Sequence, residues 1–260
     1  MLTRLLTPWG ARQSLRDQLG SVRGVYLADN RVARRDDLGE HPELVLLLHG
    51  FFQTRNIFEV MEDRLRHDGY GVVSFNLGGV LRRFNTHPID RLAELIAGKI
   101  EALADRHGFD RLHIVGHSKG GILARRYVQH FGGDRRVKSV TTLGTPHHGT
   151  PTALVGVVLS NALWTQMSAR DLMPRSSLIE RLAADPFPEH IPLTSIYSRS
   201  DLVCPYWCSV LRPRPGEEHV RNVEIRGVGH SALVWDLGVY GAVRRAIESA
   251  SAGELRAVAK

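Results

Sequence analysis

The chain has 260 residues, 43% of them hydrophobic and 23% charged, a composition typical of a globular protein long enough for one α/β domain. The net charge is +7, from 34 basic and 27 acidic residues, and the basic residues are spread along the chain, which favours a solvated arginine-rich surface. Because the sequence has no helix-turn-helix, zinc-finger or aromatic-basic RNA motif, we expect no nucleic-acid partner. Because no apolar run of about 18 residues and no secretory signal in residues 1–20 are visible, we exclude a membrane-spanning helix and expect a cytoplasmic location.

The first half of the chain alternates predicted strands and helices. Residues 44–48 form a near-continuous apolar run, which is typical of a strand buried on both faces of a parallel sheet. Residues 89–107 place apolar side chains on one helical face and acidic side chains on the other. In chain order we predict a helix over 11–19, a strand over 21–27, an exposed loop over 29–42, a strand over 43–48, a helix over 55–67, a strand over 71–75 and a helix over 89–107.

A glycine-rich turn separates the next strand from the next helix. Residues 112–115 are apolar and predict a strand, and apolar residues at helical spacing predict a helix over 122–131. The turn between them is GHSKGG, residues 116–121, with Ser118 at its apex. Small neighbours are needed there because the turn is strained, its backbone approaches the next strand, and the helix starts at once. The alternative is an ordinary turn with a solvent-facing serine, and partners elsewhere in the chain decide between the two.

The second half repeats the alternation around one insertion. In residues 151–192 the rhythm breaks, because an apolar helical stretch over 153–167 is followed by polar segments and several prolines. Strands alternating with helices elsewhere predict βαβ crossovers and an α/β fold with a doubly wound, mostly parallel sheet. The elements predicted around the insertion are strands over 137–143, 193–197 and 222–226 and a closing helix over 232–247.

Three motifs resemble the α/β-hydrolase superfamily. Residues 116–120 match its G-x-S-x-G nucleophile elbow. The stretch LGTPHHGT of residues 143–150 resembles the G-T-P-H-x-G segment of bacterial triacylglycerol lipases and esterases, and LHGFF of residues 48–52 resembles the start of a loop in the same lipases. The resemblance implies an α/β-hydrolase fold in a single domain over 1–260, with a helical cap or lid over 151–192 inserted after the sixth strand. Whether those cap helices contact substrate or only cover the sheet stays open.

The resemblance also implies a catalytic triad. A serine hydroxyl needs a base to take its proton and an acid to orient that base, and the chain order in this superfamily is serine, acid, histidine. Asp201 and His230 each follow a late predicted strand, so they are the expected acid and base for Ser118. Asp236 is the fallback acid, although it follows the histidine. Four other polar residues are expected to be solvated or structural: Asp171 and Asp185 in the insertion, and His147 and His148 beside the active-site loops.

Backbone N–H groups are expected to form the oxyanion hole. The residue after the nucleophile usually gives one of them, here Lys119, and the loop after the first buried strand gives the other, with Phe51 the leading candidate and Phe52 the reserve. The two phenylalanines would instead line the pocket wall in the alternative interpretation. Lys119 is a departure, since many lipases have methionine or glutamine there; its ammonium would favour an anionic substrate or pair with an acid.

No cofactor or metal is expected. Residues 231–233 lack the aspartate that follows the histidine in lipases with a structural calcium. Cys204 and Cys208 lack the accompanying histidines of a zinc site, and we expect both thiols to be reduced, with a local disulfide as the alternative.

The sequence therefore predicts a lipase-like or esterase-like serine hydrolase that cleaves carboxylic esters with a lipophilic acyl group through an acyl-enzyme. The expected partner is a small-molecule ester or lipid, with transient contact at a membrane surface. The alternatives are a phospholipase or thioesterase using the same triad, an amide-type inositol-lipid deacylase, or a non-catalytic module of this fold that binds a membrane or partner.

Overall fold

The computed structural model describes residues 37–78, 85–154 and 169–258. The predicted helix over 11–19 and strand over 21–27 lie outside the described residues. So do most of the predicted loop over 29–42 and most of the apolar stretch over 153–167.

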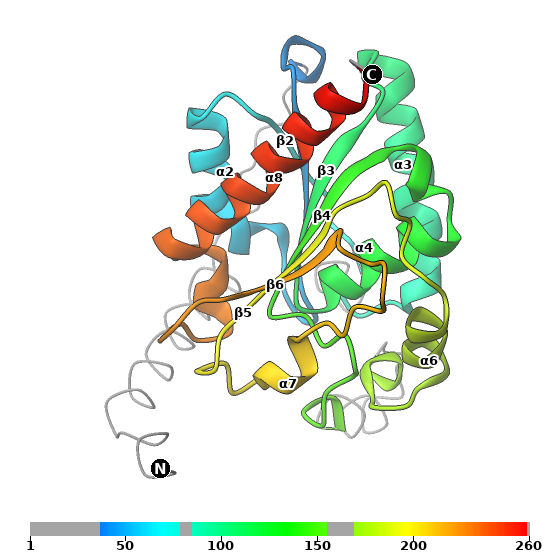
Figure 1. Cartoon of the computed structure of the whole chain (residues 1–260), viewed down its shortest axis with the longest axis vertical. Coiled ribbons are helices and arrows are strands. Elements are labelled where there is room, and N and C mark those ends of the chain that lie inside the picture. Colours follow the sequence, from blue (N-terminus) through cyan, green and yellow to red (C-terminus); the bar gives the residue numbers. More distant parts are fainter. Residues whose placement is uncertain (1–36, 79–84, 155–168, 259–260) are drawn as a thin grey trace.

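Within the described residues, six parallel strands form one sheet in the order β2-β1-β3-β4-β5-β6 (Figure 1). The chain runs from β1 outward to β2, then returns to the other side of β1 and continues outward from β3 to β6. The strand order thus reverses between β1 and β3, and in open α/β sheets ligands bind at the carboxyl ends of the strands at such a point. The strands are β1 Leu44–Leu48, β2 Gly71–Ser74, β3 Leu112–His117, β4 Val137–Leu143, β5 Leu193–Tyr197 and β6 Val220–Glu224.

Helices cover both faces of this sheet (Figure 1). Side chains of β1 alternate between two cores: Leu44, Leu46 and Leu48 pack with α3, α4 and α6, whereas Val45 and Leu47 pack with α2 and α8. This alternation explains the continuous apolar run in the sequence, because both faces of the strand are buried. The helices are α2 Glu59–His67, α3 Ile89–His107, α4 Lys119–His130, α6 Ser177–Ala184, α7 Tyr206–Ser209 and α8 Leu237–Val258.

Most predicted elements are confirmed, and the differences lie at their ends. The strand predicted over 222–226 is β6, which pairs from Val220 to Glu224; its partner β5 has no residue left to pair beyond Tyr197. The helix predicted over 232–247 is α8, which begins later because a 3-10 turn precedes it and the carboxylate of Asp236 accepts the N–H of Val239 at 3.0 Å.

The described part of the insertion packs on the sheet-covering layer. Leu178, Ile179 and Leu182 of α6 are buried in the same core as α3 and α4. The guanidinium of Arg125 in α4 donates to the carbonyl oxygen of Leu182 at 2.6 Å. The insertion follows β4, which is the fourth strand of the described sheet and not the sixth; the count differs because the described sheet begins only at Leu44. The described helix of the insertion therefore covers the sheet, as one of the two interpretations expected.

Candidate active site

The turn after β3 holds Ser118 in a strained backbone conformation. Its φ is 53° and its ψ is −122°, a region that residues with a side chain rarely adopt, and α4 begins at the next residue. A Cβ on Gly120 would lie 2.0 Å from the carbonyl oxygen of Leu48, and a Cβ on Gly121 would lie 2.1 Å from Oγ1 of Thr145. Glycine is thus required at both positions, because the turn lies directly against β1 and the segment after β4.

The carboxyl ends of β5 and β6 contribute an acid and a base in direct contact. His230 Nδ1 lies 2.6 Å from Asp201 Oδ2, and both side chains are almost fully buried. The other carboxylate oxygen of Asp201, Oδ1, accepts the backbone N–H groups of Val203 at 2.9 Å and Cys204 at 2.7 Å. The carboxylate is therefore held by its own loop. Because Nδ1 of His230 contacts Asp201, Nε2 is the ring nitrogen that remains available to another partner.

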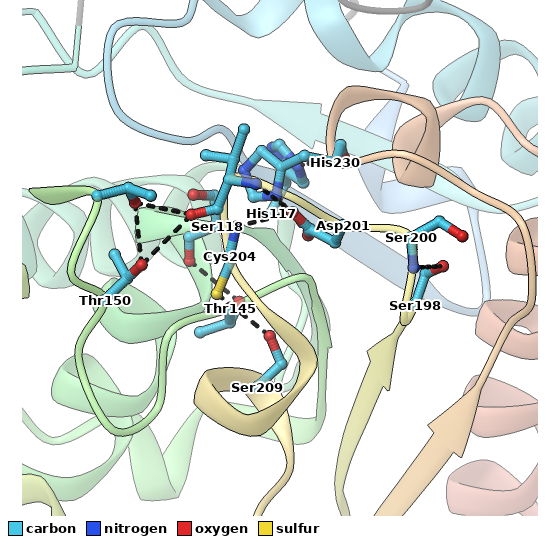
Figure 2. Close-up of polar contacts among 12 residues, drawn as sticks. His117, Ser118, Thr145, Thr150, Ser198, Ser200, Asp201, Cys204, Ser209 and His230 are labelled. Carbon is cyan, nitrogen blue, oxygen red and sulfur yellow. Dashed lines mark hydrogen bonds and ion pairs between the residues drawn. The ribbon is translucent and has the colours of Figure 1, made fainter. Parts of the chain in front are cut away.

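The nucleophile turn lies beside this acid and base pair (Figure 2). The N–H of Ser118 donates to the carbonyl oxygen of Leu143 at 2.8 Å. The next residue, Gly144, has φ +53°, and a Cβ there would lie 2.8 Å from Asp201 Oδ2 and 3.2 Å from His230 Nδ1. The three residues predicted as a triad thus gather at one end of the sheet, with Gly144 packed between the serine turn and the acid and base pair.

His117, which precedes the serine, joins two loops of this site. Its Nε2 lies 3.0 Å from the carbonyl oxygen of His230, and its Nδ1 lies 3.0 Å from Oε1 of Gln53. Burial, together with the nearby charge of His230, holds the pKa of His117 well below its ordinary value. The neutral ring therefore donates to one of these two oxygens at a time and ties the histidine loop to the loop after β1.

The loop after β1 packs against the serine. A Cβ on Gly50 would lie 2.9 Å from Cβ of Ser118, and the N–H of Gly50 donates to Oε1 of Gln53 at 2.8 Å. Phe51 and Phe52 are half-buried, with their rings edge to face at 5.2 Å, and Phe52 has a positive φ of 56°. The loop after β1 and the first turn of α4 therefore both adjoin Ser118.

The side chain of Lys119 contradicts one of the two roles expected for it from the sequence. It is fully buried, and Nζ donates to the carbonyl oxygen and Oδ1 of Asn85 and to the carbonyl oxygen of His87. Burial lowers the pKa of Lys119 well below its ordinary value, and the charge of Asp171 opposes this effect. The expectation of an ammonium offered to an anionic substrate is wrong, because these three acceptors occupy it inside the protein.

Several other expectations can be compared with the contacts. Asp171 is not simply solvated: it is partly buried, and Oδ2 accepts the N–H of Ile89 at 3.2 Å, whereas the side chain of Asp185 is 54% exposed and pairs with His130. His147 contacts Arg125 and Thr142, and His148 contacts the carbonyl oxygen of Val210. Cys204 and Cys208 are free thiols, as predicted. Asp236 is engaged at the start of α8.

Three residues near the site were missed in the sequence. His117 lies within the quoted elbow motif and Gln53 directly follows the double phenylalanine, so adjacency to a motif was the signal for both. Asn85 carries no local signal, because only the folded chain brings it to Lys119 and to the loop after β1.

Across 37–78, 85–154 and 169–258, we found no group of three or more His, Cys, Asp or Glu side chains able to hold a metal ion. In the same ranges, none of the helices combines the length and apolarity required for crossing a bilayer. The expectation of no calcium stays a prediction.

Comparisons with known proteins identify the fold family of this chain. The family model described as the alpha/beta hydrolase fold matches residues 43–179. Triacylglycerol lipases of Pseudarthrobacter phenanthrenivorans and Burkholderia plantarii are each 34% identical over 112 residues, 41% of this chain, but only 34% and 30% of their own lengths. The match thus spans about a third of these curated relatives. A proline iminopeptidase of Lactobacillus helveticus is 33% identical over 91 residues, 34% of this chain and 31% of its own length.

Solved structures support the fold alone. The mature form of the Bacillus licheniformis lipase BlEst2 superposes with a TM-score of 0.63 at 14% identity, over 79% of this chain and 92% of that one. A monoacylglycerol lipase of Paleococcus ferrophilus gives 0.57 at 16% identity, over 81% of this chain and 95% of that one.

Proposed function

Because this chain belongs to the alpha/beta hydrolase fold family, we propose that it is a serine hydrolase that cleaves carboxylic esters with a lipophilic acyl group. The observation that carries the proposal is the 2.6 Å contact between His230 and the buried Asp201, beside a serine held at φ 53°. A turn with a merely solvent-exposed serine has no need of this buried pair.

In the proposed reaction Ser118 is the nucleophile and His230 the base. Oγ of Ser118 attacks the ester carbonyl carbon while Nε2 of His230 takes its proton, and Asp201 stabilises the imidazolium that forms. His230 then returns the proton to the leaving alcohol as the C–O bond breaks, which leaves an acyl-serine. A water molecule, deprotonated by the same imidazole, hydrolyses this acyl-enzyme and restores the hydroxyl.

The charge on the tetrahedral intermediate requires backbone donors. We assign these to the N–H groups of Lys119 and Phe51, with Phe52 as the reserve. Lys119 is the first residue of α4, so its N–H is one of the unpaired donors at the positive end of a 12-residue helix. Gly50 packs against Ser118, which brings the loop donors to the same side chain.

The lipophilic acyl group is inferred from apolar side chains near the acid loop. Leu202 and Val203, directly after Asp201, are 58% and 38% exposed, and Trp207 of α7 is 57% exposed. The hydroxyl of Thr152, at the start of the insertion, donates to the carbonyl oxygen of Val203 at 2.7 Å. We therefore propose that residues 151–192 act as a cap, that the acyl chain lies between this cap and the acid loop, and that the same side chains make transient contact with a lipid surface.

Hydrolysis of p-nitrophenyl esters tests the proposal. We expect wild-type protein to hydrolyse a series from acetate to palmitate, with kcat/KM rising beyond the shortest chains, and the Ser118→Ala variant to lose this activity by at least about 10³-fold. Including acyl thioesters, phospholipids and proline p-nitroanilide in the same panel identifies a thioesterase, a phospholipase or an iminopeptidase. Wild-type turnover by a folded Ser118→Ala variant would refute the proposal.

A further inference from the structure

The loop of residues 49–53 is held at both ends by a single residue, Asn85. Nδ2 of Asn85 donates to the carbonyl oxygen of His49 at 2.8 Å, and the backbone N–H of Asn85 donates to the carbonyl oxygen of Gln53 at 3.3 Å. Asn85 is fully buried. The residues between these two contacts are Gly50, Phe51 and Phe52, which include the proposed loop donor.

Asn85 is in turn held by the ammonium of Lys119. Nζ lies 2.8 Å from Oδ1 of Asn85, 3.3 Å from its carbonyl oxygen and 2.7 Å from the carbonyl oxygen of His87. Three acceptors match the three N–H groups of an ammonium, so every donor is satisfied. Nζ also lies 5.8 Å from the centre of the Phe51 ring, within reach of a cation–π contact.

A buried lysine is energetically unfavourable at a position where the side chain only fills space. Burying an ammonium is unfavourable unless its hydrogen bonds to water are replaced, and an uncharged side chain of similar length would occupy the same volume. The polar contacts are therefore the reason for a lysine at this position. These contacts connect Lys119 through Asn85 to both ends of the loop. Lys119 therefore contributes the proposed backbone donor at the start of α4, and its side chain also fixes the loop that contributes the other donor.

We propose that the ammonium of Lys119 and the amide of Asn85 are positioning residues that set the backbone of residues 49–53 for the oxyanion. This inference rests on the proposed function. Neither side chain contacts the substrate in this account. The ammonium holds Asn85, whose amide donates to the carbonyl oxygen of His49 and whose backbone N–H donates to that of Gln53. These two contacts fix the direction of the N–H groups between them.

Two substitutions interrupt the chain of contacts at different points. Lys119→Met keeps the length of the side chain and its backbone N–H but removes the three donors. Asn85→Asp keeps an oxygen for the ammonium, and gives it an ion pair, but replaces the N–H group that holds His49 by an oxygen. The control is Lys138→Met, which removes a partly buried lysine paired with Glu43. Lys138 lies at the amino end of β4, whereas the candidate site lies at the carboxyl ends of the strands.

The readouts are kcat and KM for p-nitrophenyl butyrate, the inhibition constant of phenylboronic acid and amide hydrogen exchange. Phenylboronic acid forms a tetrahedral adduct with a nucleophilic serine. We expect both variants to lower kcat by about 10- to 100-fold with KM within about twofold, because a misdirected donor forfeits part of the 10²- to 10³-fold effect of losing one. Phenylboronic acid should bind more weakly by a similar factor, and exchange of the amides of residues 50–53 should accelerate. Lys138→Met should leave kcat within about twofold of wild type.

Each result bears on one of the two proposals. Wild-type kcat, boronate affinity and exchange in folded Lys119→Met and Asn85→Asp would overturn the positioning role, and so would a loss of kcat without faster exchange. If Lys119→Met does not fold, Asn85→Asp carries the test, because aspartate has the size of asparagine and keeps an acceptor for the ammonium. If wild type neither hydrolyses esters nor binds phenylboronic acid, while both variants still accelerate exchange in residues 50–53, the proposed function falls and the positioning of the loop stands.

Discussion

Gly144 is the position where one added methyl group acts most directly on the proposed acid and base pair. A Cβ there would lie 2.8 Å from Asp201 Oδ2, 3.2 Å from His230 Nδ1 and 2.7 Å from Cδ1 of Leu233. Relieving these contacts requires shifts of about half an ångström, and a misplacement of about 1 Å in a catalytic group costs on the order of 100-fold in rate. We therefore expect Gly144→Ala to lower kcat by about 10- to 100-fold.

Gly227 provides the matched control for this substitution. It also has a positive φ, +76°, but no atom lies within 4 Å of a Cβ placed there. Both alanine variants should lose about 1 kcal/mol of unfolding free energy from backbone strain, measured by urea denaturation, because alanine disfavours the left-handed region. Only Gly144→Ala should lose turnover of p-nitrophenyl butyrate beyond this. Equal kcat values in the two variants would refute the reasoning.

Three further predictions test the account of the fold and of the acid. Burial alone would raise the pKa of Glu43, but its hydrogen bonds and charge contacts with a histidine and a lysine lower this pKa to about 2. Glu43→Gln should therefore cost about 1 to 2 kcal/mol of unfolding free energy above pH 4.5. This difference should vanish as the pH falls towards 2, because the wild-type carboxyl then becomes protonated in the folded state as well. Gly120→Ala should abolish soluble expression, because its Cβ would meet a β1 carbonyl oxygen at 2.0 Å. Its control is Gly98→Ala on α3, where nothing lies within 4 Å of the added Cβ; this substitution should raise the midpoint of thermal unfolding. Asp236→Ala should cost about 1 kcal/mol by removing the contact at the start of α8 while leaving kcat within about twofold of wild type; a loss of activity comparable to that of Asp201→Asn would make Asp236 the acid.

Local patterns predicted the strands and helices well, because burial on both faces and helical periodicity are recorded in consecutive residues. The strands at 137–143 and 193–197 and the helix at 89–107 have their predicted bounds. The ends of β6 and α8 differ because partners distant in the chain decide them: the last residue of β5, and the carboxylate of Asp236.

The candidate site was predictable to the extent that motifs contain it. Ser118 and its glycines form one continuous stretch, and the order of Asp201 and His230 follows from the resemblance. The direction of the Lys119 side chain depends on Asn85, more than thirty residues away, so no local pattern contains it. Asp171 was expected to be solvated for the same reason, since its contact with Ile89 joins segments 82 residues apart.

Labelling with a fluorophosphonate tests the central claim most directly, because only an activated serine reacts quickly with this probe. The account predicts that intact-mass and peptide mapping place a single label on Ser118 of the wild-type protein, and that His230→Ala slows the labelling by at least about 100-fold. A label on another residue, no label at all, or an unchanged rate in folded His230→Ala would contradict it.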